Sequence, residues 1–221
     1  PSLAAYRQDS TDYFTAWVHQ IKTPLSVMRL QLQSEDTPEN RAMLAELFQM
    51  EQYVTMALSY ARLGNPTKDL VLTRVPLDPV IRQAIRDFAP LLIRKKLRLQ
   101  YEPTAESALT DSKWLLFILH QLLSNAVKYT DRGHVSIRVT SAPAIIVADT
   151  GIGIAPEDVP RVFEKGYTGY NGRGGQKSTG LGLYLVHQTA EMLHCRVSLS
   201  SRIGEGTSVT IDLHQEELGK E

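Results

Sequence analysis

The sequence predicts an α+β protein in two parts: a helical hairpin over residues 1–65, followed by an α/β sandwich over residues 66–221. Three observations predict this fold class. The first third of the chain carries two heptad-spaced apolar seams, the hydrophobic period changes after residue 64, and the strands that follow mix with helices without regular βαβ alternation. Hydrophobic residues make up 43% of the chain and charged residues 22%, a composition typical of folded globular proteins.

Two long helices are expected first. The apolar positions of one helix are spaced 4, 3, 4, 3 and 4 residues apart, at Phe14, Val18, Ile21, Leu25, Met28 and Leu32. Those of the other are spaced 3, 4, 3, 4 and 3 apart, at Leu44, Leu47, Glu51, Val54, Leu58 and Ala61. Because an unpaired buried carboxylate is costly, we expect the one charged member, Glu51, to reach solvent or a partner.

The hairpin has a predicted turn and a predicted partner. Thr37 is expected to cap the second helix, with Pro38 at its first position, and Gly64-Asn65-Pro66 is expected to end it. A lone hairpin cannot enclose its apolar stripe, so we expect a second copy of the chain to complete a dimeric four-helix bundle. The alternative is packing of the hairpin against the rest of the same chain.

The second part alternates short strands with three helices. Helices are expected over residues 78–96, with Asp78 as the cap and Pro79 at the start, over 112–129 and over 179–193. Strands are expected at 70–72 with 75–77, at 97–101, 108–110, 135–139 and 144–148, and in a closing hairpin of 197–201 with 208–213.

Charge and cysteine content narrow the class of protein. Lys plus Arg and Asp plus Glu both number 24, and a formal net charge of zero argues against a nucleic-acid partner. The single cysteine excludes an intrachain disulfide framework and a multi-cysteine metal site, and it fits a reducing compartment. No apolar stretch approaches the roughly 18–20 residues that span a bilayer. Since the chain opens at Pro1, we expect a piece of a longer protein whose upstream part can hold a membrane anchor.

Three segments carry residues that suit a nucleotide. Residues 149–154 read DTGIGI after an apolar strand, where an Asp can accept a hydrogen bond from an amine such as that of adenine and glycines allow close backbone approach. Residues 178–183 read STGLGL at a helix start, where unpaired N–H groups suit phosphate. Asn125 and Lys128 share a helix face, and their amide oxygen and ammonium suit Mg²⁺ and phosphate respectively.

A fourth segment is glycine-rich and cationic. Residues 163–177 read FEKGYTGYNGRGGQK and contain Lys165, Arg173 and Lys177, which suits a mobile lid over phosphates. Each of the four segments has a plain reading when taken alone: an Asp-Gly turn, a glycine-rich helix start, a solvated helix face and a surface loop.

The order and spacing of these segments resemble the N, G1, F and G2 boxes of the ATP-binding domain of sensor histidine kinases, which has the Bergerat fold, and residues 204–207 (GEGT) resemble its final glycine turn. The resemblance implies ATP and Mg²⁺ as ligands. It assigns the metal to Asn125 and Gln121. It assigns ATP binding to Asn125, Lys128, Tyr129, Asp149, Gly151, Gly153, Phe163, Lys165, Arg173, Lys177, Thr179, Gly180, Leu181 and Gly182.

Residues 19–24 (HQIKTP) on the first helix resemble the H box of these kinases. The resemblance implies that His19 accepts the γ-phosphoryl group of ATP and passes it to an aspartate of a response regulator. Gln20 stands where most such kinases have an acid, and it can still hold the hydrogen bond of the ring proton. Thr23 would orient water for dephosphorylation of the regulator; otherwise it is a helix-interior threonine bonded to its own backbone.

Residues 17–24, 165–173 and 178–185 resemble the bacitracin-sensor or intramembrane-sensing kinases of Firmicutes, which pair with ABC transporters of antimicrobial peptides. This implies the cytoplasmic portion of a cell-membrane protein that senses such peptides or envelope stress. Two alternatives stay open. One is a Bergerat ATPase with net hydrolysis, against which Gln121 counts because hydrolysing relatives place a Glu there. The other is a catalytically silent, nucleotide-binding dimeric scaffold.

Overall fold

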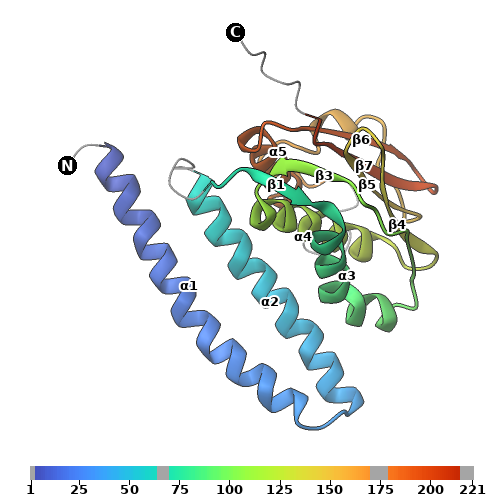
Figure 1. Ribbon diagram of the computed structural model, residues 1–221. Coiled ribbons are helices and arrows are strands. Elements are labelled where there is room, and N and C mark those ends of the chain that lie inside the picture. Colours follow the sequence, from blue (N-terminus) through green and yellow to red (C-terminus); the bar gives the residue numbers. More distant parts are fainter. Residues whose placement is uncertain (1–2, 64–69, 170–178, 215–221) are drawn as a thin grey trace. The chain divides into compact units, whose positions relative to one another are not determined.

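The computed structural model describes residues 3–63, 70–169 and 179–214, with side chains from Tyr13 onward. The chain divides into two compact units, Pro1–Asp69 and Leu70–Glu221. Each unit is described by itself below (Figure 1).

The first unit is a helical hairpin of α1 (Leu3–Gln33) and α2 (Pro38–Leu63), which run antiparallel (Figure 1). The Thr37 hydroxyl accepts a hydrogen bond from the Asn40 N–H at 3.1 Å, so the predicted cap of the second helix is confirmed. Val18 and Leu25 of the first predicted seam and Leu47 of the second are buried. The expected helix stop at residues 64–66 lies outside the described residues.

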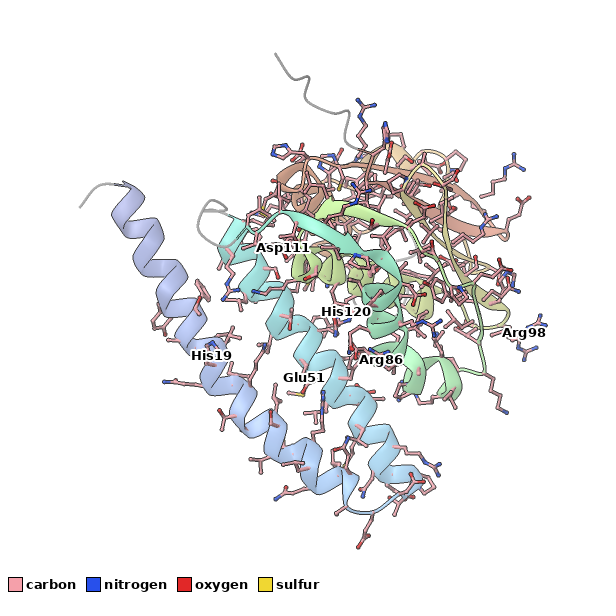
Figure 2. The ribbon with its side chains drawn as sticks, viewed as in Figure 1. His19, Glu51, Arg86, Arg98, Asp111 and His120 are labelled. Carbon is pink, nitrogen blue, oxygen red and sulfur yellow. The ribbon has the colours of Figure 1, made fainter. Side chains whose placement is uncertain are left out.

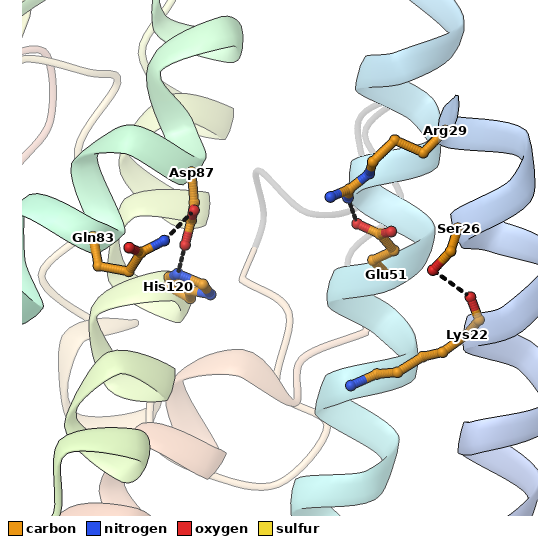
Figure 3. Close-up of polar contacts among 7 residues, drawn as sticks. All are labelled: Lys22, Ser26, Arg29, Glu51, Gln83, Asp87 and His120. Atoms are coloured by element: carbon orange, nitrogen blue, oxygen red, sulfur yellow. Dashed lines mark hydrogen bonds and ion pairs between the residues drawn. The ribbon is translucent and has the colours of Figure 1, made fainter. Parts of the chain in front are cut away.

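The charged position of the second seam has a partner. Arg29 of α1 forms an ion pair with the Glu51 carboxylate of α2, whose side chain is only 20% exposed (Figure 3). The expectation that Glu51 must reach solvent or a partner is therefore confirmed, and the partner comes from the facing helix of the same hairpin.

The second unit contains three α-helices and seven strands among its described residues. In chain order its elements are β1 (Thr73–Pro76), α3 (Leu77–Arg94), β2 (Arg98–Tyr101), β3 (Ser107–Thr110), α4 (Ser112–Tyr129), β4 (His134–Val139), β5 (Ala144–Asp149), the short 3-10 helix η2 (Val159–Arg161), α5 (Gly182–Met192), β6 (Arg196–Arg202) and β7 (Gly206–Asp212).

Five of these strands form one sheet, in the order β2-β4-β5-β7-β6. The pairing of β2 with β4 is parallel and the other pairings are antiparallel, while β1 and β3 form a separate antiparallel pair. Helices α3, α4 and α5 lie on one side of the five-stranded sheet (Figure 1). The alternate strand residues Val135, Ile137, Ile145, Val147, Val209 and Ile211 are buried, as in a sheet with one covered face. The predicted α+β sandwich is confirmed.

The central helix of this layer is α4, which packs against both α3 and α5. A polar contact joins it to α3: His120 Nε2 lies 2.9 Å from an Asp87 carboxylate oxygen, and the Gln83 amide donates to the other oxygen at 2.8 Å (Figure 3). Burial lowers the pKa of His120, and the neighbouring Asp87 partly opposes that shift.

Three predicted element starts were wrong, and each error has a physical reason. Residues 70–72 form no strand, because the Val71 N–H donates to the Asp111 carboxylate rather than to a neighbouring strand. Asp78 does not cap α3, which begins at Leu77, because its carboxylate accepts hydrogen bonds from Arg82 and Tyr101. Helix α5 begins at Gly182 rather than residue 179.

Candidate functional site

Helix α4 presents the first group of predicted site residues. Gln121, Asn125 and Lys128 follow one another at spacings of four and three residues, so they lie along one face of the helix. Gln121 is buried, and Asn125, Lys128 and Tyr129 are half-buried. Burial lowers the pKa of Lys128, whose Nζ lies 5.3 Å from the centre of the Tyr129 ring.

The start of α4 is fixed by a residue that the sequence analysis did not single out. Asp111 is buried and caps the helix, its Oδ1 accepting from the N–H groups of Lys113 and Trp114 at 2.9 and 3.3 Å. Its Oδ2 accepts from the Val71 N–H at 2.9 Å, which ties the beginning of the second unit to this helix. An Asp directly before a helical apolar run is a cap signal that could have identified it.

The turn after β5 packs its backbone directly on the last turn of α4. The Asp149 carboxylate accepts from the Gly151 N–H at 2.8 Å, and the Ile152 N–H donates to the Tyr129 carbonyl at 3.1 Å. A Cβ on Gly151 would lie 2.3 Å from that Tyr129 carbonyl oxygen, so only glycine allows this close approach. Gly153 packs in the same way on the backbone of Arg202.

Asp149 stands at the end of β5 in a half-buried position. Burial raises the pKa of its carboxyl, while hydrogen bonds, above all from the Gly151 N–H, pull it back down. A carboxylate that is already held by backbone donors on one side keeps acceptor capacity on the other. The predicted hydrogen bond from an exocyclic amine would use this remaining capacity.

The glycine-rich start of α5 lies beside α4. Gly180 has a φ of +65°, and its carbonyl accepts from the Gly166 N–H at 3.0 Å. This left-handed residue explains why the helix starts only at Gly182. The Thr179 hydroxyl accepts from the Leu181 N–H at 3.3 Å. A Cβ on Gly182 would lie 3.2 Å from Gln121 Oε1, so the first turn of α5 meets the predicted metal-binding face of α4.

The lid segment is only partly described. Phe163 is half-buried with its ring centre 5.5 Å from that of His187 on α5, and Lys165 is exposed. Arg173 and Lys177 lie outside the described residues. Tyr167, which no sequence pattern singled out, anchors this segment. Its hydroxyl donates to Asp158 at 2.5 Å, and the Arg161 guanidinium lies 4.3 Å from its ring centre. The hydrogen bond to Asp158 raises the pKa of Tyr167.

The predicted phosphoacceptor segment lies in the hairpin, in the other unit. His19 is exposed on α1 (Figure 2). Gln20 is exposed too, and the preceding residue, Val18, is buried. The prediction that the His19 ring reaches solvent is therefore confirmed. The Thr23 hydroxyl donates to the His19 carbonyl at 3.2 Å, so in this structure Thr23 makes the backbone bond that the plainer interpretation expected.

The donor set around α4 suits a magnesium ion that is held mainly by phosphate oxygens. Gln121 and Asn125 offer amide oxygens from one helix face. The described part of the chain contains no group of three or more His, Cys, Asp or Glu residues that could hold a metal ion. Mg²⁺ keeps several waters and takes only one or two protein ligands besides substrate phosphates, which this donor set fits.

No helix among the described residues is long and apolar enough to cross a membrane.

Comparison with known proteins identifies one matching family and several similar proteins. Residues 110–217 match the histidine kinase-, DNA gyrase B-, and HSP90-like ATPase family. The chain is 36% identical over 213 residues to the sensor protein BceS of Halalkalibacterium halodurans, and the aligned residues cover 95% of this chain and 64% of that relative. It is 36% identical over 203 residues to the sensor histidine kinase YxdK of Bacillus subtilis, and the aligned residues cover 89% of this chain and 62% of that relative.

Among solved structures, the chain is similar to full-length ShkA in complex with AMPPNP. The TM-score is 0.62 and the sequence identity 25%, over 90% of this chain and 45% of that one. The chain thus spans less than two thirds of the length of the curated relatives named above.

Proposed function

We propose that this chain is the kinase core of a two-component system, because residues 110–217 match the histidine kinase-, DNA gyrase B-, and HSP90-like ATPase family and the chain is 36% identical both to a sensor protein and to a sensor histidine kinase. In this proposal residues 66–221 bind ATP, and residues 1–65 form the dimerisation and phosphotransfer hairpin that carries His19. One observation carries the ATP site: the turn after β5 packs through Gly151 on the last turn of α4, and the start of α5 meets Gln121 of the same helix at Gly182.

The residues around α4 have distinct roles in this proposal. Asp149 accepts a hydrogen bond from the adenine amine, and Lys128 and the N–H groups at the start of α5 face the phosphates. Asn125, with Gln121 behind it, supplies amide oxygen to Mg²⁺, which neutralises phosphate charge when bound. Lys165, Arg173 and Lys177 add cations from the lid.

The proposed reaction is attack of a His19 ring nitrogen on the γ-phosphorus. The nitrogen–phosphorus bond forms while the bond from that phosphorus to the bridging oxygen of ADP breaks, and the ring then loses its proton. Such a transfer depends on positioning and charge neutralisation. The exposure of His19 supports this role, since an acceptor must reach a nucleotide bound by the other unit. Gln20 would hold the hydrogen bond of the second ring nitrogen.

The hairpin surface supports a dimer. Large apolar side chains of α1 and α2 are 40% exposed or more in the single chain, at Tyr13, Phe14, Trp17, Val27, Met28, Leu30, Met43, Met50, Tyr53 and Tyr60. Apolar exposure on this scale marks an interaction surface. In the proposal a second copy covers it as a four-helix bundle.

The remaining partners follow from the proposed family role. The phosphoryl group passes from His19 to an aspartate of a response regulator, and Thr23 assists dephosphorylation of that regulator. The chain would be the cytoplasmic part of a membrane protein that works with an ABC transporter of antimicrobial peptides, as its resemblance to bacitracin-sensing kinases implies.

Incubation with γ-labelled ATP tests the proposal. Label should appear on the protein in an acid-labile, base-stable form, the property of a phosphohistidine. The His19→Gln variant should keep its dimer and its nucleotide affinity but take no label. Label that persists in this variant would falsify the assignment of His19. Nucleotide binding without any label on the wild-type chain would favour the silent scaffold instead.

A further inference from the structure

The C-terminal end of α4 is capped from two sides. The last four carbonyl groups of a helix have no regular partner inside the helix, and some of them accept only from the turn that closes it. Here the Ala126 carbonyl accepts from the Thr130 N–H at 3.1 Å, and the Tyr129 carbonyl accepts from the Ile152 N–H at 3.1 Å. The two carbonyls between them, of Val127 and Lys128, need donors from elsewhere.

Lys95 supplies those donors. Its ammonium lies 2.8 Å from the Val127 carbonyl oxygen, 3.2 Å from that of Lys128 and 3.1 Å from that of Thr130. An ammonium has three N–H groups, so this one ion can satisfy all three carbonyls at once. A cation at this end is also favoured by the helix dipole. The additional contact with Asp131, at 3.4 Å, involves a carboxylate that is 85% exposed and adds little.

The backbone of Lys95 is itself held. Lys95 is the C-cap residue of α3, and its N–H donates to the Leu91 carbonyl at 3.0 Å. Its side chain is only 26% exposed. The ammonium therefore joins the end of one helix to the end of the next with little freedom on either side.

The capped turn is the one on which the predicted adenine-binding turn rests. Tyr129 receives the Ile152 N–H, and its carbonyl oxygen forms the wall against which Gly151 packs. Lys128 and Tyr129 are themselves predicted ATP-binding residues. A shift of this turn would thus move the phosphate-binding lysine and the glycine turn together.

From this geometry we infer that Lys95 is a positioning residue for the nucleotide site. Among the described residues, its ammonium bonds to backbone carbonyls and to the Asp131 carboxylate, so it acts through the last turn of α4 rather than on the nucleotide. The inference rests on the proposed function, which places ATP against that turn.

Binding of a fluorescent ATP analogue to the full chain tests the inference. Lys95→Met should weaken binding about tenfold or more, the size of effect typical of losing a group that orients ligand-binding residues. Lys95→Arg should recover part of the loss, because a planar guanidinium keeps the charge but cannot converge on three carbonyls as a compact ammonium does. Lys96→Met is the matched control, since Lys96 is the next residue along the chain and lies outside this contact, and it should bind as wild type does.

Amide hydrogen exchange supplies a readout that does not depend on nucleotide. Without ligand, the Ile152 N–H should exchange faster in Lys95→Met than in wild type, while exchange within α1 and α2 stays unchanged. Unchanged affinity and unchanged Ile152 exchange in both Lys95 variants would overturn the inference, even if their melting temperatures fall. If Lys95→Met fails to fold, the same two measurements on Lys95→Arg, analogue affinity and Ile152 exchange, decide whether the inference holds.

The two proposals fail in different ways. If the wild-type chain does not bind the analogue, the proposed function is wrong, and the exchange rate of Ile152 still decides whether Lys95 holds this turn. If the wild-type chain binds the analogue, and both Lys95 variants bind it equally well with unchanged Ile152 exchange, only the positioning role of Lys95 is wrong.

Discussion

Adding one methyl group at Gly151 should separate the glycine turn from α4. An alanine Cβ would lie 2.3 Å from the Tyr129 carbonyl oxygen and 2.9 Å from Asp149 Oδ1, where an ordinary contact begins at 3.4 Å. Both oxygens are already held, one by the Ile152 N–H and the other by the Gly151 N–H itself. Neither can move away cheaply, so the turn must shift.

The size of the effect follows from those contacts. Overpacking a close-packed site costs about 1–3 kcal/mol, and losing the hydrogen bond between Ile152 and Tyr129 costs about 1 kcal/mol more. A loss of about 2–4 kcal/mol in a unit of this size lowers its melting temperature by roughly 4–16 °C. Because the displaced turn carries the proposed adenine contact, affinity for a fluorescent ATP analogue should also fall by about tenfold or more.

Thermal unfolding and analogue binding of Gly151→Ala measure both effects. Gly204→Ala is the control, because Gly204 has a φ of +78° but no atom within 4 Å of the position that an alanine methyl group would take. It should lose only about 1 kcal/mol through backbone strain and keep its nucleotide affinity. A Gly151→Ala chain that melts and binds as wild type does would refute the close packing of this turn on α4.

Three further predictions concern single side chains. Asp149→Asn should weaken analogue binding without loss of stability near pH 7. Burial raises the pKa of the Asp149 carboxyl, so the wild-type chain loses stability as pH rises through that raised value. Denaturation curves at acidic and neutral pH should show this loss in wild type and not in the variant. Thr23→Ala should keep autophosphorylation but slow regulator dephosphorylation, measured by release of phosphate. Gln20→Glu should keep or raise the autophosphorylation rate and Gln20→Leu lower it, since general acid–base groups contribute on the order of 10²-fold or more.

Each of these three has an outcome that contradicts it. If the stability of wild type and that of Asp149→Asn respond identically to pH, burial of the carboxylate does not contribute to the free energy of unfolding. An unchanged phosphatase rate would leave Thr23 as a helix residue bonded to the His19 carbonyl. Equal rates for wild type, Gln20→Glu and Gln20→Leu would remove Gln20 from the mechanism.

Local patterns predicted most of the elements. The bounds expected for the helix at 112–129 are those of α4, and Thr37 caps α2 where the Thr-Pro pair predicted it. The glycines at 151 and 153 were expected to allow close approach to a ligand; the structure adds that Gly151 packs on the Tyr129 backbone at the end of α4 and that Gly182 meets Gln121 of the same helix. These features depend on residues close together in the chain, where period, caps and turn residues carry the signal.

Contacts between distant residues could not be predicted in this way. Nothing in the spacing of Val71 and Asp111 indicates that one donates to the other, and that bond is why the apolar run at 70–72 forms no strand. The bonds of Lys95 to the end of α4 likewise join residues more than 30 positions apart and leave no periodic trace. The start of α5 was wrong because the left-handed Gly180 is held by Gly166, a contact that the chain makes only once folded.

The strand order of the sheet bears on how this protein can vary. Asp149 in β5 and Thr207 in β7 are Cα partners in neighbouring strands, so residues 150–206, which include α5 and β6, begin and end at the same place in the sheet. The lid segment is one of the connecting loops within them. The entropy lost on closing such a loop grows only with the logarithm of its length, and a doubling costs about 0.6 kcal/mol. Insertions in the lid segment beyond its contacts at Phe163, Gly166 and Tyr167 should therefore cost little folding free energy. That leaves the length and charge of this segment free to change between related proteins while Asp149, the proposed adenine contact, keeps its place at the end of β5.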